Sequence, residues 1–152
     1  QRQMCIRDRH NNATDLYNIK KATQGSSGFD LLAAIETEIN LQPNESNLIQ
    51  CGFSLQMPNG IEAQVRPRSG IALKNCVTVL NSPGTIDADY RGELLVLAHW
   101  IGEGDSFVVE KGERIGQLLF KRVPQIRFVE VERDALDGTE RGEGGFGSTG
   151  RF

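Results

Sequence analysis

Cysteine, histidine and long apolar runs are scarce in this sequence, and each scarcity excludes a class of protein. The three cysteines, Cys5, Cys51 and Cys76, form no C-x-x-C pair, which disfavours a disulfide framework and a zinc cluster and fits a reducing compartment. The two histidines are His10 and His99, so neither a histidine-based metal site nor a Ser-His-Asp triad is expected. No apolar run approaches the roughly 18 residues of a membrane span.

An excess of basic residues is also missing. Lys and Arg number 17 against 20 Asp and Glu, which leaves a net charge of −3. A general nucleic-acid or anionic-membrane binder needs a basic face, so neither partner is expected, although a local pocket for a phosphorylated ligand stays open. Charges within residues 1–10 interrupt the apolar stretch that a signal peptide needs, so we expect a cytoplasmic protein. The 152 residues, 38% of them apolar, suit one globular domain.

Short apolar segments separated by turn residues make up most of the chain after Leu16. Because no segment keeps a 3.6-residue apolar period for three turns, the pattern predicts an all-β fold of the sandwich, jelly-roll or barrel type. One short helix is expected over residues 69–74. The expected strands lie within residues 31–35, 48–55, 61–65, 77–80, 94–101, 107–109, 115–123 and 126–131.

One apolar run and one turn motif each predict a specific local structure. The run Leu94–Ala98 is continuously apolar, which is typical of a strand buried on both faces. The tripeptide Pro58-Asn59-Gly60 stands between two apolar segments and predicts a hairpin-type turn.

The two ends of the chain differ in composition from the apolar middle. Residues 1–15 are polar, charged and without period, and the first residue is Gln, so we expect a disordered or non-native extension. Residues 16–137 are expected to form the β domain. Residues 138–152 are expected to form a flexible arm that buries almost nothing by itself, because it contains six glycines between Gly138 and Gly150.

The arm contains two motifs that mimic nucleotide-binding loops. Gly142–Gly147 matches G-x-G-x-x-G, and Gly142–Ser148 matches most of the P-loop pattern. Both motifs need a following helix whose first turn holds the phosphate, and five residues follow Gly147, so both interpretations are rejected. Composition alone favours a disordered tail, but the arginine, the aromatic ring and the two hydroxyls of the arm can also wrap a polyphosphate once a ligand binds.

Polar positions in the loops between the expected strands are candidates for function, because loops on a rigid scaffold often carry it. Arg68 and Ser69 can donate to phosphate oxygens, or they belong to a solvated loop. Asp87, in the long turn over residues 81–92, is either a turn residue or a catalytic carboxylate. Asp30 stands at the edge of an apolar segment and needs a partner, for which the simplest choice is an internal ion pair with an arginine.

Five short stretches together resemble the five motifs of the trimeric dUTPase (dUTP diphosphatase) family, in the same order. They are Ser27–Leu31, Pro67–Gly70, Gly84–Gly92, Gly112–Gln117 and Arg141–Gly150. The fold of this family is a distorted β jelly roll, or β-clip, which agrees with the strand pattern. The resemblance implies hydrolysis of dUTP to dUMP and pyrophosphate with Mg²⁺, which keeps uracil out of DNA and supplies dUMP for thymidylate synthesis.

The resemblance also implies a role for each matching residue. Asp87 is similar to the general base that orients a water for attack on the α-phosphorus. Asp30 resembles the carboxylate that supports the water shell of Mg²⁺, an ion held mainly by the triphosphate, and Tyr90 resembles the residue packed under the deoxyribose, where a 2′-hydroxyl would clash. The other implied substrate-binding positions are Arg68, Ser69, Gly70 and Gln117 for phosphates, Asn81, Gly84, Thr85 and Ile86 for uracil, and Arg141, Phe146, Gly147, Ser148 and Thr149 for the arm that closes on the γ-phosphate and base.

Three chains share the active sites in this family, so the resemblance implies a homotrimer. A hairpin backbone can imitate a base-pairing edge, exclude a 5-methyl group and leave cytosine unpaired, which would select uracil. Two alternatives stay open, a dCTP deaminase-like enzyme of the same fold and a non-catalytic deoxynucleotide-binding module.

Three features depart from the family pattern. Ser27 stands where the family commonly has alanine, which is a conservative change. Asn75-Cys76 replaces a pair that commonly ends in glycine, which can alter a turn. The first strand of the family, expected before the first motif, is predicted to be short, altered or lost.

Overall fold

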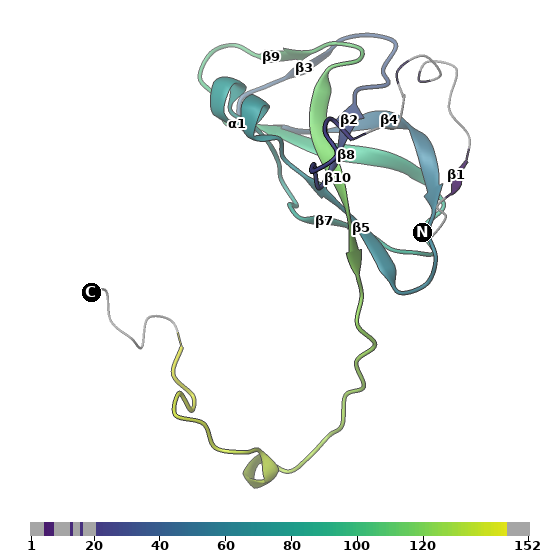
Figure 1. Ribbon diagram of the computed structural model, residues 1–152. Helices are drawn as coiled ribbons and strands as arrows, with labels where there is room; N and C mark the ends of the chain where they lie inside the picture. Colours follow the sequence, from purple (N-terminus) through teal and green to yellow (C-terminus); the bar gives the residue numbers. More distant parts are fainter. Residues whose placement is uncertain (1–4, 8–12, 14–15, 17–20, 146–152) are drawn as a thin grey trace.

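The computed structural model describes residues 5–7, 13, 16 and 21–145, and Figure 1 shows an all-β body followed by an extended C-terminal segment. The all-β prediction and the short helix are confirmed. No helix in the described ranges is long and apolar enough to cross a membrane. The elements are β1 (Cys5–Arg7), β2 (Phe29–Leu32), β3 (Ile39–Leu41), β4 (Ser46–Gln56), β5 (Ile61–Arg66), α1 (Ser69–Asn75), β6 (Val77–Val79), β7 (Gly84–Ile86), β8 (Glu93–Trp100), β9 (Phe107–Val109), β10 (Arg114–Arg122) and a 3₁₀ turn over Arg133–Ala135.

Two four-stranded antiparallel sheets enclose one apolar core. The first has the order β1-β4-β8-β6 and the second the order β2-β10-β5-β7, while β3 and β9 form a separate two-stranded ribbon. Ile49 and Val96 of the first sheet and Leu31, Val65 and Leu118 of the second are all buried in the core. This arrangement agrees with the jelly-roll expectation, in which alternate residues of each strand face a shared interior.

The outer face of the first sheet carries leucine side chains that no other described element covers. Along β8 the even-numbered residues from Leu94 to Trp100 are buried, whereas Leu95 and Leu97 are half-buried on the other face. Leu48 of β4, which pairs with Leu97, is 59% exposed. The prediction that β8 is buried on both faces is therefore wrong for the single chain, because nothing in the described chain covers this face of the sheet.

The Pro58-Asn59-Gly60 turn connects two sheets instead of closing a hairpin. Gly60 has a φ of 78°, a left-handed conformation that glycine adopts without steric cost. The flanking strands β4 and β5 belong to different sheets, so the hairpin prediction is wrong although the turn is present. A local turn signal specifies a reversal of the chain, but it does not specify the pairing partners of the strands that leave it.

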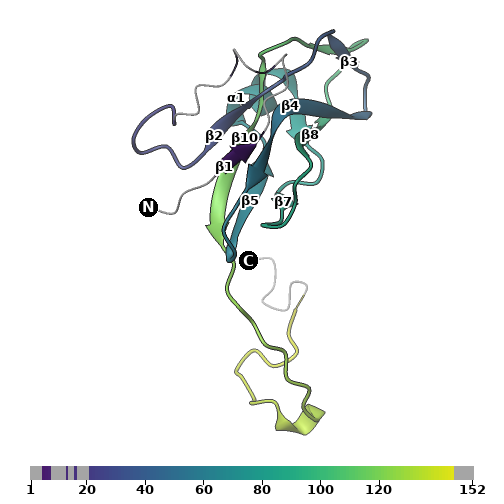
Figure 2. The same cartoon turned by 90° about the vertical axis from the view of Figure 1, so that its right-hand side faces the viewer.

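The predicted strand at 126–131 does not form, and the compact body ends at β10. Every residue from 121 to 143 is exposed, and Figure 2 shows this segment leaving the sandwich beyond β10. The apolar side chains of Phe128 and Val129 are 93% and 69% exposed. Valine–glutamate alternation stabilises a strand only beside a sheet edge that covers its apolar face, and the described part of the chain provides none here. The exposed segment therefore begins near residue 123, earlier than the predicted boundary at 138.

Part of the N-terminal stretch belongs to the folded body. β1 pairs antiparallel with the end of β4. Ala13 is fully buried beside Gly52, where an added Cβ would lie 2.3 Å from the Cβ of Ala13, and Leu16 packs against the core. The structured β1 and Ala13 differ from the disordered extension expected for residues 1–15, whose other members lie outside the described residues.

Cys76, which ends helix α1, is a non-glycine residue in a left-handed backbone conformation (φ 55°, ψ 31°). Such a conformation costs an L-residue roughly 1–2 kcal/mol, partly offset by the greater freedom that glycine has in the unfolded chain. We expect Cys76→Gly to raise the free energy of unfolding by about 0.5–1 kcal/mol. The midpoint of urea unfolding at fixed protein concentration measures this change.

Cys76→Ala is the matched control, because it removes the exposed thiol but keeps the Cβ. Alanine should leave the urea midpoint at its original value. An equal rise for alanine and glycine would show that the thiol, and not the backbone conformation, causes the instability.

Candidate active site

A polar cluster forms where β2, β10 and the loop before α1 meet. Asp30 of β2 lies opposite Gln117 of β10 in the sheet. One carboxylate oxygen of Asp30 forms an ion pair with Arg68 Nε at 2.9 Å, and the other forms one with Arg114 Nε at 3.2 Å. The predicted ion pair between Asp30 and an arginine is thus confirmed, and a second arginine joins it.

Backbone contacts hold this cluster in place. Gln117 Nε2 donates to the carbonyl oxygen of Pro67 at 2.9 Å, which ties β10 to the loop that carries Arg68. An added Cβ on Gly28 would lie 2.8 Å from Gln117 Oε1, so the absence of a side chain there makes room for the amide. Arg68 has an extended backbone immediately before the helix, and Pro67, with its restricted φ, precedes it.

The charges of the cluster favour an anionic ligand. Two guanidinium groups and one carboxylate leave one net positive charge. The side chains of Arg68, Arg114 and Asp30 are 30%, 63% and 34% exposed, so a ligand can reach them. Arginine is well suited to phosphate because its planar donors match the phosphate oxygens. Ser69 and Gly70 are exposed beside Arg68.

Arg114 is a member of this cluster that sequence reasoning missed. It lies within the fourth motif, but nothing in its local pattern distinguishes it from a solvated strand residue. Its proximity to Asp30 depends on the pairing of β10 with β2, residues more than 80 positions apart.

A second group of predicted residues lies around β7, at an edge of the second sheet. β7 pairs with β5 on one side, with Thr85 opposite Gln64, and it is the last strand in the sheet order. The backbone groups on its other side are therefore not used by a described sheet partner. Gly84 is buried, and an added Cβ would lie 3.1 Å from the amide nitrogen of Asn81, which places the Asn81 side chain beside the strand.

Asp87 stands in an ordered turn directly after β7. Its carbonyl oxygen accepts a hydrogen bond from the backbone N–H of Tyr90 at 3.2 Å. Arg91 Nη1 donates to the carbonyl oxygens of Ala88 and Tyr90 at 2.7 and 2.9 Å, and the Tyr90 hydroxyl donates to the carbonyl oxygen of Glu93 at 3.0 Å. The Asp87 carboxylate is exposed, so this turn presents a carboxylate and a phenol ring on a fixed backbone.

The two groups lie far apart within one chain. From Asp30 the sheet passes through β10 and β5 to β7, which is about 14 Å at the usual strand spacing. Across the sheet, Asp30 pairs with Gln117, which in turn pairs with Arg66. Ile86, the last residue of β7, pairs instead with Ala63, further along β5. Asp87 is therefore displaced from Asp30 by about another 13 Å along the strand direction. The Asp30 and Asp87 backbones are thus roughly 20 Å apart, and one copy does not bring both carboxylates to one reaction centre.

The C-terminal arm is separate from both groups. Arg141 lies in the exposed segment that leaves the body (Figure 1), where its Nε donates to the carbonyl oxygen of Gly144 at 2.7 Å. This contact closes a local turn and involves no residue of the sheets. The predicted arm residues Phe146, Gly147, Ser148 and Thr149 lie outside the described residues.

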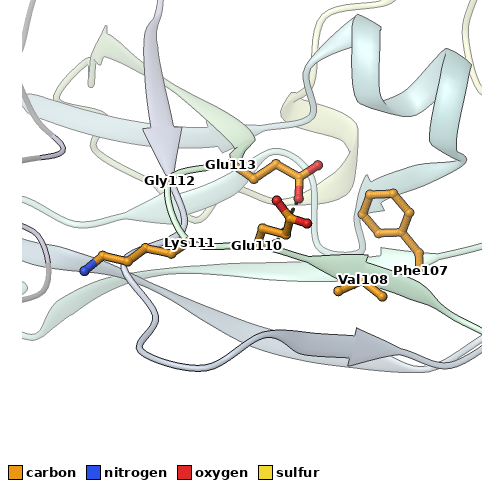
Figure 3. A pocket seen from close by; sticks show the side chains of 6 residues that line it. All are labelled: Phe107, Val108, Glu110, Lys111, Gly112 and Glu113. Carbon is orange, nitrogen blue, oxygen red and sulfur yellow. Dashed lines mark hydrogen bonds between the residues drawn. The ribbon is translucent and has the colours of Figure 1, made fainter.

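One hollow of about 490 Å³ lies at the end of β9 and the start of β10, lined by Phe107, Val108, Glu110, Lys111, Gly112 and Glu113 (Figure 3). None of the predicted catalytic or substrate-binding residues lines it. Its two carboxylates against one lysine disfavour a triphosphate. Glu113 Oε2 accepts the backbone N–H of Glu110 at 3.2 Å, which suits a structural turn.

The fold and the polar clusters define an all-β protein with a cationic site suited to a phosphorylated ligand. The family model described as dUTPase matches residues 15–150. The chain is 53% identical over 131 residues to a deoxyuridine 5'-triphosphate nucleotidohydrolase of Caulobacter vibrioides, covering 85% of this chain and 83% of the relative. It is 48% identical over 132 residues to the Fusobacterium nucleatum protein of the same name, covering 87% and 88%. The chain therefore belongs to the dUTPase family.

Solved structures show the same fold at lower identity. A mutant dUTPase of phage 80alpha superposes with a TM-score of 0.80 at 24% identity, covering 96% of this chain and 98% of the phage chain. Another 80alpha mutant, solved with dUpNHpp, has a TM-score of 0.77 at 24% identity over 97% and 98%. A mutant from phage phi11 of S. aureus, described with a structural Mg(II) ion, has a TM-score of 0.76 at 18% identity over 86% and 97%.

Proposed function

We propose that this chain hydrolyses dUTP to dUMP and pyrophosphate. The observation that carries the proposal is the dUTPase family match over residues 15–150, a range that contains every predicted site residue. The named relatives of about 50% identity support the same reaction. Of the three hypotheses from the sequence, the dUTP hydrolase is therefore favoured over the deaminase-like enzyme and the non-catalytic module.

The triphosphate is bound on the side of the molecule that carries Asp30. Arg68 and Arg114 supply positive charge, and the Ser69 hydroxyl supplies a donor. A Cβ added to Gly70 would meet nothing within 4 Å, so the first turn of α1 leaves open space for a ligand. The Gln117 amide, held against Pro67 at 2.9 Å, limits the movement of the loop before α1. These donors neutralise and position the phosphates, which is most of what phosphoryl transfer requires.

Mg²⁺ fits this site through the triphosphate more than through protein ligands. Both oxygens of Asp30 already form ion pairs with arginines, and the described residues contain no group of three or more side chains able to hold a metal ion. Mg²⁺ commonly keeps several waters and binds substrate phosphates in such sites. We therefore propose that Asp30 contacts waters of the ion, and that the ion, when bound, neutralises charge on the phosphates.

Uracil is read by the free edge of β7. Successive residues of an edge strand offer N–H and C=O groups in turn, so the backbone of Gly84, Thr85 and Ile86 can pair with the polar edge of a pyrimidine. Asn81, beside Gly84, adds an amide. A cytosine amino group would face a donor here and leave both groups unpaired, and a 5-methyl group would approach the strand too closely.

Asp87 acts as the general base on the water that attacks the α-phosphorus. It follows the uracil-reading strand directly, so a base bound at β7 places its sugar and α-phosphate near this turn. An exposed carboxylate on an ordered turn can orient a water without a change of backbone conformation. Tyr90, on the same turn, packs against the deoxyribose.

A homotrimer completes each site. The separation of roughly 20 Å between Asp30 and Asp87 requires that the phosphate side come from one copy and the base side from another. The uncovered face bearing Leu48, Leu95 and Leu97 supplies an apolar surface for contact between copies. The exposed segment with Phe128 carries the arm of residues 138–152 toward a neighbouring site. Closed symmetric assembly is the usual form of such homo-oligomers.

The location of the protein stays a prediction. Cys76 is an exposed cysteine outside any disulfide, which fits the cytoplasm proposed from the sequence. The net charge of −3 fits the absence of a nucleic-acid or membrane partner.

The proposal is tested by incubating the protein with each deoxynucleoside triphosphate, or with UTP, and Mg²⁺. We expect pyrophosphate from dUTP, at a kcat/KM at least about 10²-fold above that for dTTP, dCTP or UTP. EDTA should lower the rate about tenfold or more. Ammonia released from dCTP would instead support the deaminase-like enzyme, and binding of dUTP without product would support the binding module.

A further inference from the structure

The ring of Tyr90 folds back over Gly92, two residues further along the chain. A Cβ added to Gly92 would lie 2.3 Å from the Tyr90 hydroxyl oxygen, 2.5 Å from Cζ and 2.9 Å from Cε2. Real Cβ atoms essentially never approach other atoms so closely, so any other residue at 92 would displace the ring. Gly92 is not among the glycines with positive φ, so its backbone conformation does not itself require glycine.

The same contact fixes where the ring points. The Tyr90 hydroxyl donates to the carbonyl oxygen of Glu93 at 3.0 Å, which is possible only while the ring passes over residue 92. The backbone N–H of Tyr90 bonds to the carbonyl oxygen of Asp87, so the ring is anchored to the turn that carries the carboxylate. Tyr90 remains 42% exposed, which leaves part of the ring free to contact a ligand.

We propose that Gly92 is a positioning residue that sets the sugar specificity of the enzyme through Tyr90. The inference rests on the proposed function, in which Tyr90 lies under the deoxyribose. With glycine at 92 the Tyr90 ring lies back against the chain, in a position where it would clash with a 2′-hydroxyl of the sugar. With a Cβ at 92 the Tyr90 ring must move away and its hydrogen bond to the Glu93 carbonyl breaks. The steric discrimination against a 2′-hydroxyl is then lost.

The test is Gly92→Ala, with kcat and KM measured for dUTP and UTP. We expect the ratio of kcat/KM for dUTP to that for UTP to fall about tenfold or more, because discrimination depends on differential contacts in the transition state. Two failures are distinguishable. A wild-type protein that does not hydrolyse dUTP, or that hydrolyses UTP equally well, removes the proposed function. A discriminating wild type with an unchanged ratio in Gly92→Ala removes the role of Gly92.

Gly102→Ala is a matched control at the other end of β8. An added Cβ there would lie 2.3 Å from Trp100 Nε1, 2.6 Å from Cε2 and 2.9 Å from Cζ2. That ring also lies two residues upstream and donates to a backbone carbonyl, that of Asn75, at 2.9 Å. The control carries a similar steric conflict away from the proposed site, so it should lower stability without changing the dUTP-to-UTP ratio. An equal drop in the ratio for both variants would overturn the proposal.

A double variant keeps the proposal testable where Gly92→Ala does not fold. In a Tyr90→Ala background no ring opposes the new Cβ, so Tyr90→Ala/Gly92→Ala should fold and match Tyr90→Ala in its dUTP-to-UTP ratio within about twofold. Failure of the double variant to fold, or a further fall in its ratio, would show that Gly92 acts through the backbone and not through the ring.

Discussion

Asp87→Asn is expected to lower kcat for dUTP by about 10³-fold, because general-base assistance contributes roughly 10² to 10⁴ to such reactions. Asparagine keeps the size of the side chain but cannot accept a proton from water. Since Asp87 orients a water and does not hold the nucleotide, the Kd for dUTP should change by less than about threefold. Pyrophosphate release measures the first quantity, and equilibrium binding of dUTP measures the second.

Asp89→Asn is the matched control, because Asp89 is an exposed carboxylate on the same turn. It should keep most of the activity. If Asp87→Asn retained full turnover, or if both variants lost it equally, Asp87 would not be the base.

Mixing Asp87→Asn chains with a second variant tests whether the active sites are shared between copies. A refolded equal mixture of Asp87→Asn and Arg68→Ala chains should regain about one quarter of the wild-type activity, because that fraction of sites in a random mixed trimer receives intact Asp87 from one chain and intact Arg68 from the next. Sites contained within single chains would give no recovery.

Deletion of residues 138–152 is expected to lower kcat/KM for dUTP by about 10²-fold or more while the fold persists. The arm is proposed to order on the ligand and exclude water from the reacting phosphate, and such positioning accounts for much of the barrier reduction. The fold should persist because every residue from 121 to 143 is exposed and adds nothing to the core. Steady-state kinetics measure the first effect, and thermal unfolding measures the second.

Single substitutions show whether the charge of the arm, and not only its length, accounts for the loss of activity. Arg141→Gln should reproduce much of the loss, since it removes the charge proposed to bind the γ-phosphate. Arg133→Gln, in the same exposed segment, breaks only the exposed ion pair with Glu143 and should leave the kinetics unchanged. Full activity in the deletion variant would show that the arm is dispensable.

The longer strands were predictable, because one face of each is buried in the chain's own core. In β5 the alternation of Ala63 and Val65 with polar residues corresponds to the observed burial. The same rule failed at residues 126–131, whose apolar face is uncovered in the described chain. Strands β3 and β7 were not found by apolar pattern, because each has only three residues, of which one is buried and one half-buried, and so short a segment gives too weak a signal.

The candidate site was predictable to the level of residue types in motifs, but not to the level of contacts. Asp30 and its need for a cation followed from a carboxylate beside an apolar segment. The identity of its partners did not, because Arg68 and Arg114 reach Asp30 only through the pairing of β2 with β10 and the loop after β5. The ring contact between Tyr90 and Gly92 likewise depends on how the turn closes.

The sequence alone determined the all-β class, the short helix, the positions of most turns and the five motifs that identify the family. These features depend on local periodicity and on the conformational preferences of single residues. Tertiary structure decided that β4 and β5 belong to different sheets, that Asp30 binds two arginines, and that Asp30 and Asp87 lie far apart within one chain. The physical reason is that a strand's pattern records which of its faces is buried, whereas its hydrogen-bonding partner is chosen by contacts between distant parts of the chain.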